Sequence, residues 1–148
     1  MKNNFFDFLE SRGFIHQYTD KESTKKLLKE EICTGYIGFD CTSDSLHIGS
    51  LLPLMILRNF QKFGHKPIIL IGGGTTLIGD PSGKDETRKI LTKNEIDKNK
   101  KKLKKIFEKF VCFDEKKSNC AMIVDNYDWL MQLKFIPFLR EVGSKFSV

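Results

Sequence analysis

The order of apolar and polar positions divides the chain into a short polar beginning and a longer alternating part. Two helical patterns come first, one from Asn4 to Gly13 and one from Thr19 to Leu28. The first pattern ends at a glycine and the second begins at a threonine, which are residues typical of helix ends and starts. From residue 35 onward, apolar runs alternate with longer runs of helical spacing. We therefore predict a peripheral helical lead-in over residues 1–34 and a second unit over residues 35–148.

The alternating part predicts a parallel sheet, because strands that alternate with helices are usually joined by right-handed crossovers. The last two expected strands are unbroken apolar runs, as expected for strands that are covered on both faces. The fold class predicted is α/β, a Rossmann-like parallel sheet with flanking helices. The expected strands are Gly35–Asp40, Pro67–Ile71 and Ala121–Val124, and the expected helices are Leu51–Phe63, Asn94–Phe110 and Leu130–Val142.

Composition fits a soluble globular domain, since 148 residues with 40% hydrophobic content can build a core. No apolar run approaches the roughly 18 residues of a membrane span, and the first residues lack the apolar stretch of a signal peptide. We therefore expect a cytoplasmic location and no membrane partner. The four cysteines form no C-x-x-C pair, and the three histidines show no zinc spacing, so we expect no metal site.

The net charge of +6 and the pI of about 9.1 fit a polyanionic partner, but much of the positive excess lies between Lys98 and Lys105. An apolar stripe in the same helical pattern would turn these lysines outward. The lysines are then either a solvated helix face or a contact for RNA, and both interpretations stay open. The stripe consists of Leu103, Ile106, Phe107 and Phe110.

The pattern with the most chemistry runs from Tyr36 to Ser50, where an extended apolar run meets a helix start through an oxygen-rich turn. Gly49 lets the backbone approach a ligand, and His47 offers a hydrogen-bond donor. The free N–H groups at a helix start favour an anion such as phosphate. The segment His47–Ser50 resembles the His-Ile-Gly-His signature of the class I aminoacyl-tRNA synthetases, and Tyr36–Asp40 resembles the tyrosine-specific members in particular.

The resemblance continues through Gly72–Lys84 and Asp125–Trp129 and so covers most of the chain. It implies a tyrosine–tRNA ligase that uses ATP, accompanied by Mg²⁺, to form tyrosyl adenylate and then charges tRNA(Tyr) in protein synthesis. It also implies a homodimer. Three predicted strands are fewer than the five or six of a doubly wound nucleotide fold. We therefore expect residues 35–148 to be the first half of the nucleotide-binding catalytic domain, and this piece alone to be inactive.

The chemistry implied by the resemblance is attack of a carboxylate on the α-phosphorus of ATP, which requires positioning and stabilisation of growing negative charge. The resemblance assigns a role to each matching residue. The catalytic residues would be His47, Thr42, Lys84 and Arg88; tyrosine would be bound by Tyr36, Asp80, Thr75 and Asn126; and ATP would be bound by Gly38, Asp40, Gly49 and Ser50.

Plainer interpretations exist for several of these residues. A lone histidine such as His47 is often structural, Thr42 can close a turn, and Tyr36 can be a core strand residue. Two positions also depart from the family pattern. Ser50 replaces the second histidine of the signature, although its hydroxyl can still cap the helix or donate to the nucleotide. Ile37 stands where some relatives have a thiol that reaches the ribose, and isoleucine cannot form that hydrogen bond.

The glycine-rich stretch fits neither common phosphate motif. A P-loop requires a glycine and a Ser or Thr where Ile78 and Asp85 stand, and Leu77 occupies the place of the last glycine of a dinucleotide fingerprint. We expect the glycine-rich stretch that ends at Lys89 to be flexible enough for Lys84 and Arg88 to act as mobile cations, with a plain solvent loop as the alternative. Two rival functions remain: a non-catalytic nucleotide- or RNA-binding module of the same fold, and a tryptophanyl-type synthetase.

Overall fold

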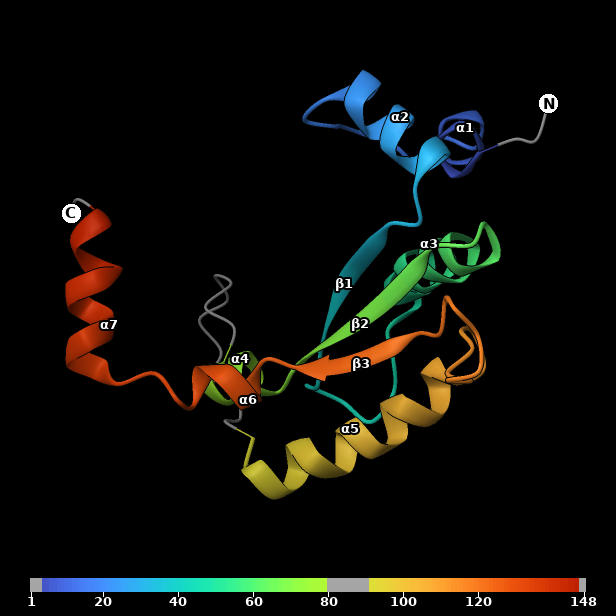
Figure 1. Cartoon of the computed structure of the whole chain (residues 1–148). Coiled ribbons are helices and arrows are strands. Elements are labelled where there is room, and N and C mark those ends of the chain that lie inside the picture. The colour runs from blue at the N-terminus through green and yellow to red at the C-terminus, as the bar shows by residue number, and fades with distance from the viewer. Residues whose placement is uncertain (1–3, 80–90, 147–148) are drawn as a thin grey trace.

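The computed structural model describes residues 4–79 and 91–146, and its centre is a three-stranded parallel sheet of order β1-β2-β3 (Figure 1). The strands are β1 (Thr34–Asp40), β2 (Lys66–Gly72) and β3 (Met122–Asp125). Each begins and ends within one residue of its predicted bounds. The predicted α/β fold with a parallel sheet is confirmed.

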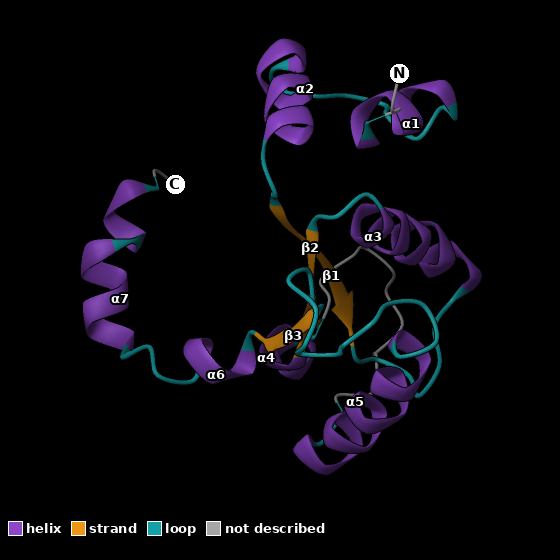
Figure 2. Ribbon diagram, turned by 45° about the vertical axis from the view of Figure 1, so that its right-hand side comes forward, coloured by secondary structure: helices purple, strands orange, loops and turns teal. Residues whose placement is uncertain are grey.

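Two helices pack against one face of the sheet, which we call the covered face. After a 3₁₀ turn, η1 (Ile48–Ser50), helix α3 (Leu51–Lys62) returns along the sheet, and α5 (Lys93–Phe107) lies beside it (Figure 2). A capping box of Thr92 and Glu95 starts α5, and the helix ends three residues earlier than predicted. These helices and the sheet enclose one core. Its buried residues are Phe39, Cys41, Leu54, Leu57, Ile69, Ile71, Ile96, Leu103, Phe107, Val111 and Ala121.

The opposite face of the sheet, which we call the open face, is only partly buried within the described residues. Tyr36 of β1, Ile68 of β2 and Met122 of β3 lie side by side in register on this face. Tyr36 is 69% exposed and Met122 is 54% exposed. The prediction that β2 and β3 are covered on both faces is therefore wrong for the described part of the chain. An unbroken apolar run shows that a strand can be buried, but it does not specify what covers it.

The lead-in is less peripheral than predicted, because α1 (Phe5–Ser11) packs on the C-terminal end of α3. Phe5 and Phe6 are buried, and the Phe5 ring centroid lies 5.1 Å from that of Phe60. Helix α2 (Lys21–Glu30) has no buried residue. The lead-in therefore attaches to the core through one aromatic cluster.

The C-terminal region contains two short helices where one helix from Leu130 to Val142 was predicted. Helix α6 (Tyr127–Leu130) ends early, and α7 (Phe135–Glu141) begins four residues after it, followed by η2 (Gly143–Lys145). Pro137 explains the error. Proline is tolerated in the first turn of a helix but breaks a hydrogen bond in the interior, so the helix that contains Pro137 has to begin shortly before it.

Candidate active site

The carboxyl ends of the three strands bring most of the predicted site residues to one edge of the sheet. Asp40 ends β1 opposite Gly72, which ends β2, and Asp125 ends β3 opposite Ile71. Helix α4 (Gly73–Ile78) begins directly after β2. Open α/β sheets bind ligands at this edge, because loops and helix starts converge there.

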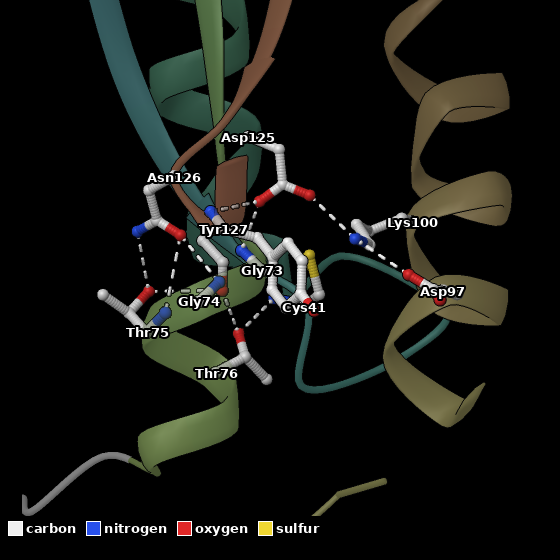
Figure 3. A network of polar contacts seen from close by, with 11 residues as sticks. Cys41, Gly73, Gly74, Thr75, Thr76, Asp97, Lys100, Asp125, Asn126 and Tyr127 are labelled. Atoms are coloured by element: carbon white, nitrogen blue, oxygen red, sulfur yellow. Dashed lines mark hydrogen bonds and ion pairs between the residues drawn. The ribbon is translucent and has the colours of Figure 1, made fainter. Parts of the chain in front are cut away.

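Three predicted site residues form one chain of hydrogen bonds at this edge. The side-chain oxygen of Asn126 accepts a hydrogen bond from the Gly74 N–H at 2.7 Å, and its Nδ2 donates to Thr75 Oγ1 at 3.2 Å. Figure 3 shows these contacts of Asn126 with Gly74 and Thr75. Thr75 Oγ1 is also 3.2 Å from Asp40 Oδ1, to which it can donate. Asn126 is buried, whereas Thr75 and Asp40 are exposed. A buried amide therefore fixes a hydroxyl and a carboxylate that face solvent.

A second group, which the sequence analysis did not single out, adjoins this chain on the covered side. Asp125 Oδ1 accepts hydrogen bonds from the N–H groups of Gly73, at 3.1 Å, and Tyr127, at 2.9 Å. Asp125 Oδ2 lies 2.7 Å from Lys100 Nζ, which also pairs with Asp97 Oδ1 at 2.9 Å. Sequence reasoning missed Lys100 because it is one lysine in a run, and its spacing from the buried Ile96 and Leu103 was the available signal.

The glycines that end β2 and begin α4 leave room for carboxylate side chains that lie close to their backbone. A Cβ at Gly72 would overlap Asp40 Oδ1, and a Cβ at Gly73 would overlap the Asp125 carboxylate. Residues 73–78 form α4, because glycine lowers helix propensity without excluding a helix. The predicted flexibility of the segment that carries Lys84 and Arg88 lies outside the described residues.

Cys41 and Thr76 join the turn after β1 to α4. Thr76 Oγ1 donates to the Gly72 carbonyl oxygen at 2.6 Å and accepts from the Cys41 N–H at 3.0 Å, while Asn99 Nδ2 donates to the Cys41 carbonyl oxygen at 2.8 Å. The Cys41 side chain is fully buried, and burial together with the nearby Asp125 charge raises the pKa of its thiol to about 12. Cys41 is therefore a structural residue.

His47 has both a structural contact and a free donor. Its Nδ1 accepts the Gly49 N–H at 3.0 Å, so a neutral ring carries its proton on Nε2. The side chain is exposed, and a Cβ at Gly49 would lie only 3.2 Å from Nδ1. Ser50 precedes α3 without a side-chain capping bond. Of the two roles considered for its hydroxyl, donation to the nucleotide stays a prediction.

Tyr36, Gly38 and Thr42 line the open side of the same region. All three are exposed, and space above Gly38 is open, because a Cβ there would meet no atom within 4 Å. Within residues 4–79 and 91–146, no side-chain hydrogen bond of Tyr36 or Thr42 is formed. Their ligand roles remain predictions. The predicted roles of Asp80, Lys84 and Arg88 lie outside the described residues.

Across the two described ranges, no group of three or more His, Cys, Asp or Glu side chains could hold a metal ion. No helix in these ranges is long and apolar enough to cross a membrane.

The amino-acid sequence of this chain is similar to that of known proteins over most of its length. Residues 28–148 match the family model described as "tRNA synthetases class I (W and Y)". The chain is 51% identical over 148 residues to a tyrosine–tRNA ligase of Clostridium tetani, covering 36% of that protein. It is 53% identical over 146 residues to that of Beijerinckia indica, covering 34% of it. The chain thus spans about a third of the length of the curated relatives it matches.

Two solved structures share the fold. A C-terminally truncated mitochondrial tyrosyl-tRNA synthetase of Aspergillus nidulans matches 99% of this chain with a TM-score of 0.77 and 26% identity, over 44% of its own length. The corresponding Coccidioides posadasii structure matches 99% of this chain with a TM-score of 0.71 and 28% identity, over 42% of its own length. The resemblance inferred from the motifs is confirmed, and the chain belongs to the class I tRNA synthetases of the tryptophan and tyrosine family.

Proposed function

We propose that this chain supplies the first part of the catalytic domain of a tyrosine–tRNA ligase, which forms tyrosyl adenylate from tyrosine and ATP and then charges tRNA(Tyr). Two observations support the proposal. Curated relatives whose sequences are about 50% identical to this chain are named tyrosine–tRNA ligases. At the carboxyl edge of the sheet, the exposed Asp40 and Thr75 are joined by a hydrogen bond, and the buried Asn126 holds Thr75 in place. In this proposal residues 1–34 are the helical lead-in and residues 35–148 begin the nucleotide-binding domain.

Tyrosine would bind along the open face and its carboxyl edge. The Thr75 hydroxyl has lone pairs that can accept a hydrogen bond from an ammonium group, and Asp80 would supply the matching negative charge. Tyr36 lies on the same face, where its exposed phenol can hydrogen-bond the phenol of the substrate. A site whose polar group phenylalanine leaves unpaired rejects that amino acid.

ATP would bind where β1 leads into η1. Gly38 leaves open space for a nucleotide, and Asp40, Gly49 and Ser50 surround the turn. As the tyrosine carboxylate bonds to the α-phosphorus, the bond to pyrophosphate breaks and negative charge moves onto the leaving group. The Nε2–H of His47 and the hydroxyl of Thr42 would donate to that charge.

Two further groups complete the proposed site. Lys84 and Arg88 would act as mobile cations on the departing pyrophosphate. Mg²⁺, when bound, offsets phosphate charge and would enter with ATP, whose own oxygens are suitable ligands. Among the described residues, this edge carries the carboxylates of Asp40 and Asp125, and Asp125 is paired with Lys100, so these two groups do not form a carboxylate cage for the ion.

The proposal also includes a cytoplasmic location and a homodimer. Helix α7 presents exposed apolar side chains that an assembly of two copies would cover: Phe135, Ile136, Phe138 and Leu139.

The experiment that tests the proposed function is pyrophosphate exchange by a chimera in which this chain replaces the matching third of the Clostridium tetani ligase. We expect tyrosine-dependent exchange by the chimera and little or none by the 148-residue chain alone. Exchange that requires tryptophan would favour the tryptophanyl alternative. Binding of ATP without exchange by a folded chimera would favour the non-catalytic module and contradict the proposal.

A further inference from the structure

The ion pair of Lys100 and Asp125 lies to one side of the Thr75–Asn126 pair, with Gly73 and Gly74 between the two pairs (Figure 3). Lys100 comes from the middle of α5 and Asp125 from the end of β3, immediately before Asn126 in the chain. Their side chains are only 20% and 17% exposed. Nothing in the family resemblance assigns a role to this pair, although it touches the backbone that carries the proposed tyrosine ligands.

One carboxylate oxygen of Asp125 holds the starts of two helices together. Oδ1 accepts from the N–H of Gly73, the first residue of α4, and from that of Tyr127, the first residue of α6. Such N–H groups have no partner within their own helix, so their orientation depends on this acceptor. The next N–H in α4, from Gly74, donates to Asn126 Oδ1. The orientation of the Asp125 carboxylate therefore fixes how α4 meets Asn126.

Lys100 in turn fixes that carboxylate. It binds the other oxygen, Oδ2, and its Nζ also pairs with Asp97 and lies 5.5 Å from the centre of the Tyr127 ring. A poorly solvated carboxylate is costly without a partner. Burial disfavours the charged form of Lys100, but hydrogen bonds to Asp125 and Asp97 outweigh burial and raise the pKa of Lys100 above its ordinary value. Lys100 thus stays charged across the working pH range.

We propose that Lys100 is a positioning residue for tyrosine binding, which acts through Asp125 to hold α4 and thereby the Thr75 hydroxyl and the Asn126 amide. The inference rests on the proposed function, because that function makes tyrosine the ligand of Thr75 and Asn126. Lys100 itself touches no substrate in this account.

The same helix supplies a matched control. Lys102 Nζ pairs with Asp44 Oδ2 at 2.6 Å, and these side chains are 61% and 51% exposed. Exposed pairs of this kind contribute little to stability. Lys102→Met therefore removes one α5 lysine and one exposed ion pair without touching α4, whereas Lys100→Met removes the pairs with both Asp97 and Asp125.

The first test is amide hydrogen exchange by NMR on this chain. Lys100→Met should accelerate exchange at the Gly73 and Tyr127 N–H groups about tenfold, which corresponds to loosening one charge-assisted contact. Lys100→Arg and Lys102→Met should leave both rates within about twofold of the original. Equal rates in Lys100→Met and Lys102→Met would overturn the proposal.

A double variant keeps this test decisive if the unpaired Asp125 carboxylate unfolds the Lys100→Met protein. Lys100→Met with Asp125→Asn leaves no poorly solvated charge unpaired, because Asp97, which also loses Lys100, is 42% exposed. The variant keeps an acceptor for both N–H groups. Without the lysine that fixes the side chain, Gly73 should still exchange several-fold faster than in the original chain. Full protection of Gly73 in the double variant would overturn the proposal.

The second test separates positioning from stability in the active chimera. Lys100→Met should raise KM for tyrosine about tenfold and leave KM for ATP within about twofold, and Lys100→Arg should recover most of the loss. Equal losses for both substrates, or none, would overturn the proposal. If the unsubstituted chimera shows no exchange activity, the proposed function fails, while the hydrogen-exchange test still decides whether Lys100 holds α4.

Discussion

The two faces of the sheet use neighbouring residues of the same strand for different purposes. On β1, Phe39 points into the core, whereas Tyr36 and Asp40 are exposed on the open face. The covered face is apolar and packed against α3 and α5. The open face carries three of the residues that the family resemblance assigns to ligands, Tyr36, Gly38 and Asp40. The contrast shows that one strand can contribute to the core with one face and to ligand binding with the other. Substitutions on the covered face should therefore lower stability, and substitutions on the open face should lower ligand affinity or activity.

The largest expected effect is on the covered face. Phe107 is fully buried, and its ring centroid lies 5.1 Å from that of Phe39. Phe107→Ala should lower the free energy of unfolding of this chain by about 3–5 kcal/mol, because it removes apolar burial and leaves a cavity. Met122→Ala on the open face should change it by less than about 1 kcal/mol. Urea denaturation measures both, and similar losses in the two variants would break the distinction between the faces.

The next effect concerns the rate of adenylate formation. In the chimera, His47→Ala should slow this step by about 10²–10³, the usual result of deleting one donor to developing charge. The affinity for tyrosine and ATP should change by less than about threefold. Because Nδ1 caps the Gly49 N–H, some stability should be lost as well.

His47→Asn is the control for that lost cap, since asparagine can accept the Gly49 N–H. It should melt near the original temperature and still form adenylate slowly. Pre-steady-state adenylation and thermal melting separate the two contributions. A normal rate in His47→Asn would remove the imidazole from the mechanism.

A smaller effect is expected for amino-acid specificity. Tyr36→Phe in the chimera should narrow the preference for tyrosine over phenylalanine by about 1–3 kcal/mol, the range for one hydrogen bond that faces a buried polar group. The unfolding free energy should stay the same, because the side chain is largely exposed. The ratio of kcat/KM for the two amino acids measures the effect, and an unchanged ratio would assign Tyr36 to packing alone.

The smallest expected effect concerns the reactivity of the cysteine thiols. Cys41 is fully buried, and burial raises the pKa of its thiol to about 12, whereas Cys33 and Cys112 are only half-buried. At pH 8, iodoacetamide should therefore modify Cys41 last, and only as fast as the chain unfolds. Peptide mass spectrometry over a time course would show this order. Early modification of Cys41 would mean that the covered face opens readily.

The strands and the motif positions could be predicted from the sequence because both are local properties. Apolar runs located β1, β2 and β3, and the motifs that carry the family resemblance identified Asp40 and Asn126 as site residues. The open face could not be predicted, because an apolar run such as Ile68 to Ile71 does not identify its neighbours.

The Lys100–Asp125 pair and helix α4 were not predicted, because both depend on contacts between residues that are far apart in the sequence. Lys100 and Asp125 are 25 residues apart, and only the packing of α5 against the sheet brings them together. Helix α4 was missed because its glycines indicated a loop, although each is required by a carboxylate or an amide that approaches its backbone. Side-chain contacts over long sequence separations therefore decided how the site is held, while the sequence identified the family.

The most direct test of the account is the dissociation constant for tyrosine of the chimera with and without Thr75→Val, measured by equilibrium dialysis. Thr75 is exposed and lies between Asn126 and Asp40, and the change to valine keeps its shape while removing its hydroxyl. We predict that tyrosine binds about tenfold more weakly with unchanged ATP affinity, and that the melting temperature falls because the buried Asn126 amide loses an acceptor. An unchanged dissociation constant for tyrosine would contradict the claim that the open edge of this sheet binds the amino acid.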